Sequence, residues 1–339
     1  MIRNIIVIAT RILVRNKIFS LINIFGLSIG LACALLIMTI VKQQVTYDRF
    51  HEKSGHIFCL QQKMELGTGS YTTDRSGAAV GLALVESFPE FSAVVRISHP
   101  QEMLVSYNPP DKSNVDAATR KLFIENAVLA VESNFFDLFT FPSLSGDLST
   151  ALVDPYAVVL TRETAEKYFG DEQALGESFT INTEYIFTVT AVVENLPKNS
   201  SIQFDFLINF SFLKKLGSDL ESFDGNPYIT FLYMDDPSRQ AGIDQEITEY
   251  LDEYQDEEVE VEQHLLPLKD LRSEGETRGH IFNLVLSLLG IIILAIACIN
   301  FMNLSTARYL DRTREEGMRK VLGAGRGQLI KQFLGETMI

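Results

Sequence analysis

The chain has 339 residues, of which 46 % are hydrophobic, and it carries a net charge of −15. The charge is uneven: residues 1–41 carry four Lys or Arg and no acid, residues 302–339 carry seven basic and four acidic residues, and residues 42–301 therefore carry −22. An acidic middle between two basic ends argues against nucleic acid as a partner and fits a soluble domain outside an inner membrane.

The first 17 residues place Ile5, Ile8 and Ile12 at helical spacing, with four basic residues between and after them. This pattern predicts an amphipathic helix that lies on membrane lipid at the cytoplasmic face. Residues 18–41 follow without a charge, and 14 of these 24 residues are Leu, Ile, Val or Phe. They predict a first transmembrane helix. A cleaved signal peptide or a lipoprotein signal at Cys33 is the alternative interpretation.

Gly26 and Gly30 are four residues apart in the predicted first span. The spacing Gly-x-x-x-Gly lets a second helix approach closely, so both glycines are candidate helix-packing positions. Glycines that are merely tolerated in the span are the other explanation.

Residues 42–280 are long enough for a substantial core or two lobes. We expect an α+β fold of two lobes, in which a second lobe at about 105–215 is inserted into the first. The predicted strands are 57–64, 93–98, 102–107, 122–131, 157–160, 179–181, 186–193, 204–210, 228–234 and 259–266. The predicted helices are 77–88, a short helix capped by Ser133, 163–169 with Thr161 as its cap, and 238–254.

Residues 281–307 contain no Asp, Glu, Lys or Arg, and 14 of residues 281–301 are Leu, Ile, Val or Phe. Those side chains favour insertion into a bilayer by roughly 4–8 kcal/mol. Residues 281–303 therefore predict a second transmembrane helix, with a buried helix of a soluble protein as the alternative. Basic residues flank both spans on the side of the chain ends, so both ends are predicted to be cytoplasmic and residues 42–280 periplasmic.

Residues 304–339 predict a charged helix, a turn and the start of another helix. Glu315 and Arg319, and Glu316 and Lys320, are spaced four apart with the acid first, and Gly323 is predicted to end the helix. A charged helix attached directly to a span can pass force to a cytoplasmic partner. The alternative is a juxtamembrane anchor on anionic lipid.

The sequence contains no recognisable catalytic, metal or cofactor site. It has no Gly-x-x-x-x-Gly-Lys-Ser/Thr and no His-Glu-x-x-His. His51 and His56 are expected to be surface residues, and the three cysteines are not expected to form a structural disulfide. We therefore expect no intrinsic enzymatic activity.

Several motifs resemble the FtsX/MacB-like family of ABC-transporter permeases. They are Arg15-Asn-Lys-Ile-Phe-Ser-Leu-Ile-Asn-Ile-Phe-Gly-Leu-Ser-Ile-Gly-Leu, Tyr47-Asp-Arg-Phe-His51, Cys298-Ile-Asn-Phe-Met-Asn-Leu-Ser-Thr-Ala-Arg308 and Arg314-Glu-Glu-Gly-Met-Arg-Lys-Val-Leu-Gly-Ala324. The resemblance implies a porter-like lobe with an inserted lobe, located at the inner membrane of a bacterium.

The resemblance also implies partners. A separate ABC ATPase subunit, which binds the ATP, would dock on the segment carrying Glu316, Gly317, Arg319, Lys320, Gly323 and Ala324. A second permease copy or a paralogue would complete the membrane part, with a periplasmic or outer-membrane partner as a further option. Members of the family continue with further spans after this segment, so we expect this chain to be a piece of a longer protein. A membrane sensor and a cell-envelope scaffold that activates a periplasmic partner are the alternative functions.

Overall fold

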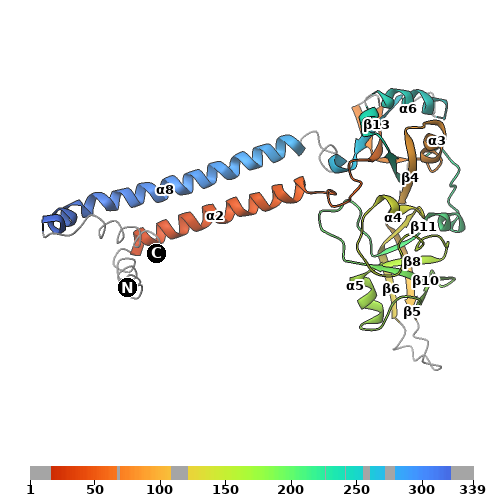
Figure 1. The fold of residues 1–339 in the computed structure, drawn as a ribbon, viewed down its shortest axis with the longest axis horizontal. Coiled ribbons are helices and arrows are strands. Elements are labelled where there is room, and N and C mark those ends of the chain that lie inside the picture. Colours follow the sequence, from red (N-terminus) through yellow and green to blue (C-terminus); the bar gives the residue numbers. More distant parts are fainter. Residues whose placement is uncertain are drawn as a thin grey trace. The chain divides into compact units, whose positions relative to one another are not determined.

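The computed structural model describes residues 17–66, 69–107, 121–225, 227–240, 242–254, 260–271 and 279–321. These residues fall into two compact units, one within Met1–Val45 and His280–Ile339 and the other within Thr46–Gly279. The first unit holds two long helices, α2 (Lys17–Val45) and α8 (Gly279–Val321). The second unit holds the strands and the short helices (Figure 1).

Both long helices contain a segment that is long and apolar enough to cross a membrane, Ile24–Val45 in α2 and Ile281–Asn303 in α8. We call these segments span 1 and span 2. Only 6 % of the first segment and 11 % of the second is buried. A core helix of a soluble protein would be mostly buried, so this alternative does not fit either helix. The exposed side chains are chiefly Ile, Leu, Val, Phe and Met, which suit lipid.

Four antiparallel strands and two helices of the second unit form what we call the sheet lobe. In chain order they are β1 (Ile57–Leu66), α3 (Val80–Ser87), β4 (Phe91–Ser98), β12 (Tyr228–Met234), α6 (Ile243–Leu251) and β13 (Glu260–Pro267). Their spatial order is β13-β1-β12-β4. This is the order of a ferredoxin-like fold, in which each β-α-β unit is split by a strand of the other. The short strands β2 (Gly69–Thr73) and β3 (Arg75–Ser76) pair with β1 and β12.

The chain between β4 and β12 forms what we call the barrel lobe. Its six main strands are β5 (Gln101–Tyr107), β6 (Lys121–Val131), β8 (Ala157–Thr161), β9 (Ser178–Ile181), β10 (Tyr185–Val193) and β11 (Phe206–Asn209). They pair in the order β11-β8-β10-β9-β5-β6, and β6 also pairs with β11, which closes the barrel. Strand β7 (Ser143–Ser145) adds to β10, and α4 (Phe135–Leu138) and α5 (Arg162–Phe169) lie between strands. Figure 1 shows the barrel strands below the sheet lobe.

Four short 3-10 helices complete the second unit: η1 (Phe210–Leu216), η2 (Pro237–Gln240), η3 (Asp252–Tyr254) and η4 (Leu268–Asp270).

Alternate residues of every barrel strand form the barrel core, which includes fully buried Phe179, Phe187 and Phe206. A second cluster lies under α3 and α6 in the sheet lobe. A third cluster, which we call the shared core, takes residues from both lobes: Cys59 and Phe231 from the sheet lobe, Val193 and Leu207 from the barrel, and Phe135 from α4. Packing between the lobes is therefore largely apolar.

The structure confirms most predicted strands and corrects two helices. Asn134 and not Ser133 precedes α4, and its side chain makes no capping hydrogen bond. The predicted helix 238–254 is interrupted at Gly242, whose φ of 101° is left-handed, so α6 begins only at Ile243. Thr161 caps α5 as predicted, because its side chain accepts the N–H of Thr164.

Candidate functional site: the attachments of the two spans

Gly26 and Gly30 lie where α2 and α8 approach each other as antiparallel neighbours. A Cβ atom on Gly30 would lie 2.5 Å from Cβ of Ala297, and one on Gly26 would lie 3.1 Å from Nδ2 of Asn300. Gly290 of α8 lies against Ile37 in the same way. A larger side chain at Gly30 would push the helices apart, since two Cβ atoms cannot approach to 2.5 Å.

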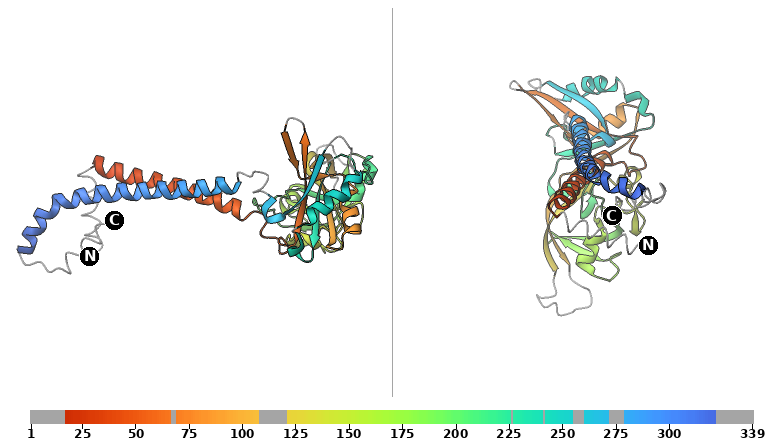
Figure 2. Two further views of the ribbon diagram at one scale, coloured as in Figure 1. Left: turned by 90° about the horizontal axis from the view of Figure 1, so that it is seen from above. Right: turned by 90° about the vertical axis from the view of Figure 1, so that its left-hand side faces the viewer.

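The predicted docking residues lie partly on α8. This helix continues without a break from span 2 to Val321, and Figure 2 shows that it bends toward its C-terminal end. Glu316, Gly317, Arg319 and Lys320 lie in its last turns, whereas Gly323 and Ala324 lie outside the described residues. At 1.5 Å per residue, the helix extends about 27 Å beyond the end of span 2 at Asn303.

The chain that follows span 1 is held by hydrogen bonds to two loops of the barrel lobe; we call these contacts the first anchor. The carboxylate of Asp48, which is 1 % exposed, accepts the backbone N–H of Ser201 at 2.7 Å and the hydroxyl of Ser201. The backbone N–H of Asp48 donates to the carbonyl of Asn199 at 2.9 Å. The Asn199 side chain returns a bond to the carbonyl of Thr46 at 2.8 Å. Residues 46–48 are thus attached to the loop between β10 and β11.

The backbone at Asp48 has a φ of 53°, which lies in the left-handed region. This conformation costs a residue other than glycine about 1–3 kcal/mol and persists where the surroundings fix it. Aspartate tolerates it better than most residues. The bonds from Ser201 and to Asn199 supply the fixation here. These bonds therefore hold the backbone of Asp48 in its left-handed conformation.

The next residues bond to the segment between β6 and β7. The backbone N–H of Thr140 donates to Nδ1 of His51 at 3.0 Å, and the hydroxyl of Thr140 accepts the N–H of Glu52 at 3.1 Å. The ammonium group of Lys53 donates to the carbonyl of Asp137 at 2.6 Å. These bonds complete the first anchor, whose partners all lie between β4 and β12.

His51 is 1 % exposed, so the expectation that it is a surface residue is wrong. Because Nδ1 accepts from Thr140, the proton of the neutral ring is on Nε2, which is buried and has no hydrogen-bond partner. The rings of Phe139 and Phe141 both lie 5.3 Å away, edge to face. Burial in this aromatic surrounding lowers the pKa of His51 to about 4, so the ring is neutral at physiological pH. His56 is half-buried and stacks on Tyr233.

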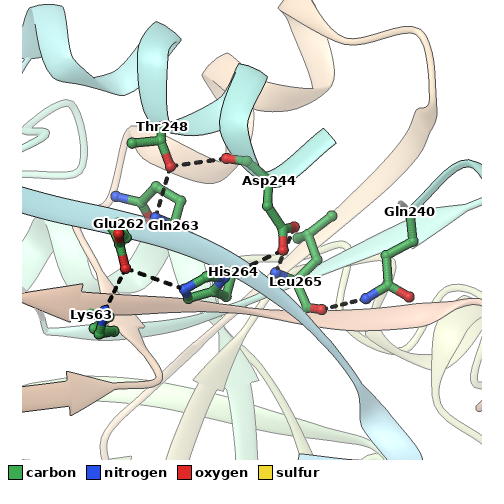
Figure 3. Close-up of polar contacts among 8 residues, drawn as sticks. All are labelled: Lys63, Gln240, Asp244, Thr248, Glu262, Gln263, His264 and Leu265. Carbon is green, nitrogen blue, oxygen red and sulfur yellow. Dashed lines mark hydrogen bonds and ion pairs between the residues drawn. The ribbon is translucent and has the colours of Figure 1, made fainter. Parts of the chain in front are cut away.

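The strand that leads to span 2 is held along both edges; we call these contacts the second anchor. One edge of β13 pairs with β1 over eight residue pairs, from Phe58 and Pro267 to Glu65 and Glu260. At the other edge, Figure 3 shows side chains of α6 and η2 bonded to the backbone of β13.

Three side chains make the bonds to the outer edge of β13. The hydroxyl of Thr248 accepts the N–H of Gln263 at 2.9 Å, and the carboxylate of Asp244 accepts the N–H of Leu265 at 3.1 Å. The amide of Gln240 donates to the carbonyl of Leu265 at 2.7 Å. These contacts cover an edge that would otherwise offer unpaired backbone groups to another strand.

Sequence reasoning missed Asp48, Asn199 and Ser201. Asp48 lies in the Tyr-Asp-Arg-Phe-His motif that carries the family resemblance, but an aspartate shortly after a span reads as a solvated charge. Its partners are 151–153 residues away in the sequence. Within the described residues, no group of three or more His, Cys, Asp or Glu side chains could hold a metal ion. Burial, together with the charge of Asp74, raises the pKa of the Cys59 thiol, which therefore stays protonated.

Comparisons with known proteins agree with this architecture. Residues 20–250 match the MacB-like periplasmic core domain family, and residues 287–339 match the FtsX-like permease C-terminal family. YvrN of Bacillus subtilis, described as an uncharacterised ABC transporter permease, is 26 % identical over 219 residues, which are 62 % of this chain and 53 % of YvrN. The chain thus spans about half the length of this relative.

One solved structure shows the same fold for the outer domain, and a second aligns less closely. A domain of a protein from Porphyromonas gingivalis, described as a permease, aligns with a TM-score of 0.52 at 21 % identity and covers 64 % of this chain and 91 % of that chain. The periplasmic region of MacB from Actinobacillus actinomycetemcomitans aligns with a TM-score of 0.44 at 13 % identity, over 67 % of this chain and 96 % of that chain. On the evidence of the two family matches, which together cover most of its length, the chain belongs to the MacB/FtsX-like family of ABC-transporter permeases.

Proposed function

We propose that this chain acts in the permease subunit of an ABC transporter that works by mechanotransmission. A separate ATPase subunit binds and hydrolyses ATP in the cytoplasm, and the permease itself performs no catalysis. The two spans pass the movement of the ATPase to the outer domain, which changes shape and exports or releases a substrate in the periplasm. A second permease copy or a paralogue completes the membrane part.

The observation that carries this proposal is the unbroken helix α8. It contains span 2 and, about 20–26 Å beyond the end of that span, the residues Glu316, Gly317, Arg319 and Lys320 of the segment that resembles an ATPase-docking site. A continuous helix resists bending and compression along its axis, because each turn is hydrogen-bonded to the next. Force applied near Arg319 would therefore reach the outer end of span 2 with little loss.

The docking assignment concerns Glu316, Gly317, Arg319, Lys320, Gly323 and Ala324. The basic pair in the last turns of α8 suits an acidic groove on an ATPase, while the small residues that follow allow close approach. The positions of the basic residues support a cytoplasmic location for this segment. Lys and Arg precede span 1 and follow span 2, and such residues are enriched on the cytoplasmic side of a membrane.

Charge reversal tests this assignment. The double substitution Arg319→Glu and Lys320→Glu should abolish co-purification of an ATPase with the protein from membranes. Insertion of the protein into the membrane should be unchanged. The matched control exchanges the two cations, Arg319→Lys and Lys320→Arg, and should retain most of the ATPase. Equal recovery of the ATPase with the reversed and the exchanged variants would contradict docking at this segment.

A further inference from the structure

The first anchor attaches the chain that follows span 1 to the barrel lobe. Its bonds run from Thr46, Asp48, His51 and Lys53 to the loops at 137–140 and 199–201. Both loops belong to the chain segment inserted between β4 and β12. Residues 46–53 lead into β1 of the sheet lobe, and the ammonium of Lys53 lies 5.6 Å over the ring of Tyr233 of β12, but the hydrogen bonds of the first anchor reach the inserted lobe.

The second anchor attaches the chain that leads to span 2 to the sheet lobe. Strand β13 pairs with β1 on one edge and is bonded to α6 and η2 on the other (Figure 3). The ion pair between Lys63 of β1 and Glu262 of β13, at 2.6 Å, adds to the ladder. All these partners belong to the sheet lobe. The chain that follows span 1 is thus bonded to the barrel lobe before it enters β1 of the sheet lobe, whereas the chain that leads to span 2 is bonded to the sheet lobe.

The lobes are joined by hydrogen bonds along β4 and at the start of α3. Strands β4 and β6 pair at one position, Ile97 with Val131. The hydroxyl of Ser98 accepts the N–H of Ala130, the amide of Asn134 donates to the carbonyl of Val94, and the N–H of Ala79 donates to the carbonyl of Ser222. Next to the pair of Ile97 and Val131, the guanidinium of Arg96, which is 6 % exposed, bonds to Glu132 at 2.5 Å and to the carbonyl of Ala78 at 2.6 Å. The other contacts of the shared core are apolar and non-directional.

From this arrangement we infer that the two spans drive different lobes: span 1 moves the barrel lobe through Asp48, and span 2 moves the sheet lobe through β13. A displacement of one span relative to the other then becomes a displacement between the lobes, about the junction of β4 and β6. Asp48 is a positioning residue in this scheme. The inference rests on the proposed function, because it requires that the spans move.

Distances between spin labels on the two lobes test the inference in the full chain with its co-purified ATPase. Glu86→Cys of α3 and Gln173→Cys of the barrel lobe are exposed positions for the labels. Cys33→Ala and Cys298→Ala remove the native cysteines of the spans, and buried Cys59 can remain. The distance is measured by pulsed electron paramagnetic resonance, without nucleotide and with a non-hydrolysable ATP analogue.

The decisive variants weaken the bonds of Asp48. Asp48→Asn keeps a residue that tolerates the left-handed backbone but removes one of two acceptor oxygens. Ser201→Ala keeps the backbone bond and removes the hydroxyl, which guards against a folding defect in the first variant. The matched control is Asp147→Asn: the carboxylate of Asp147 accepts the N–H and hydroxyl of Ser149, but it lies in an exposed turn and its bonds belong to neither anchor.

The expected result is a nucleotide-dependent change in the distance in the unmodified chain and in Asp147→Asn. In Asp48→Asn and Ser201→Ala most of this change is lost, while the ATPase still co-purifies and hydrolyses ATP. A full change in both anchor variants would overturn the inference and leave the proposed function standing. A distance that does not respond to nucleotide in the unmodified chain, with an active ATPase bound, would instead overturn the movement on which the proposed function rests.

Discussion

The first and second anchors join the outer domain to its spans by different kinds of hydrogen bond. The first depends on a few side-chain hydrogen bonds between residues 46–53 and two loops, among them those of Asp48, Asn199 and Thr140. The second depends mainly on the backbone of β13, which pairs with β1 over eight residue pairs. Backbone ladders persist through most substitutions, whereas a buried side-chain bond disappears when one atom is removed. Most single substitutions should therefore weaken the first anchor more than the second.

The largest expected effect comes from a proline in the second anchor. The N–H groups of Gln263 and Leu265 point to α6, so that of His264 points to β1. His264→Pro removes this donor and leaves a carbonyl of β1 without its partner, which should lower the free energy of unfolding by more than about 3 kcal/mol. His264→Thr keeps the ladder and is the control. Urea unfolding of the chain in detergent, followed by circular dichroism, measures both; equal stability of the two variants would contradict the ladder.

The next effect concerns pH and the first anchor. The pKa of His51 is about 4 in the folded protein and 6.5 in the unfolded chain, so between these values only the unfolded chain binds the proton. The contribution of neutral, buried His51 to the free energy of unfolding is complete above pH 6.5 and is lost as the pH falls toward 4. The full loss is roughly 3 kcal/mol.

Unfolding measured from pH 7 to pH 4 tests this effect. Other groups titrate in the same window, so the informative quantity is the difference between the unmodified chain and His51→Asn. Asn can still accept the N–H of Thr140 but has no imidazole to protonate. We expect the stability of the unmodified chain to fall more steeply toward low pH; parallel profiles would show that burial of His51 does not control its protonation.

A smaller effect is expected in the helix pair. Gly30→Ala places a Cβ against Ala297, so α2 and α8 must separate, at a cost of about 1–3 kcal/mol. Ala297→Gly in the same chain removes the opposing Cβ and should restore most of the loss. Thermal unfolding in detergent compares the single and double variants. If the double variant unfolds at a lower temperature than Gly30→Ala alone, the two positions do not face each other.

Much of the outer domain could be predicted from the sequence because its signals are local. Thr161 and Gly170 mark the ends of α5, and the turn at 182–184 joins β9 and β10 in a hairpin. The closure of the barrel could not be predicted in this way. It depends on the pairing of β6 with β11, whose residues are about 78 positions apart, and hydrophobic alternation does not specify which strand is the partner.

Less of the candidate site could be predicted from the sequence. The glycines of span 1 carry a spacing signal, and the structure places α8 against both. Asp48 and His51 carry no such signal, since a charged residue and a histidine near a span are most simply read as exposed. Their burial is a consequence of loops at 137–140 and 199–201 that fold over them. Helix 238–254 was predicted as one element because Gly242 alone is a weak signal for a break.

The most direct test of the account is to isolate the full-length protein from its own membranes and to identify what accompanies it. We predict a stoichiometric ATP-binding cassette subunit and ATP hydrolysis by the isolated complex. A histidine kinase or a response regulator in its place, with no ATP-binding cassette subunit, would contradict the account: the outer domain would then be a sensor and the end of α8 a signalling linker.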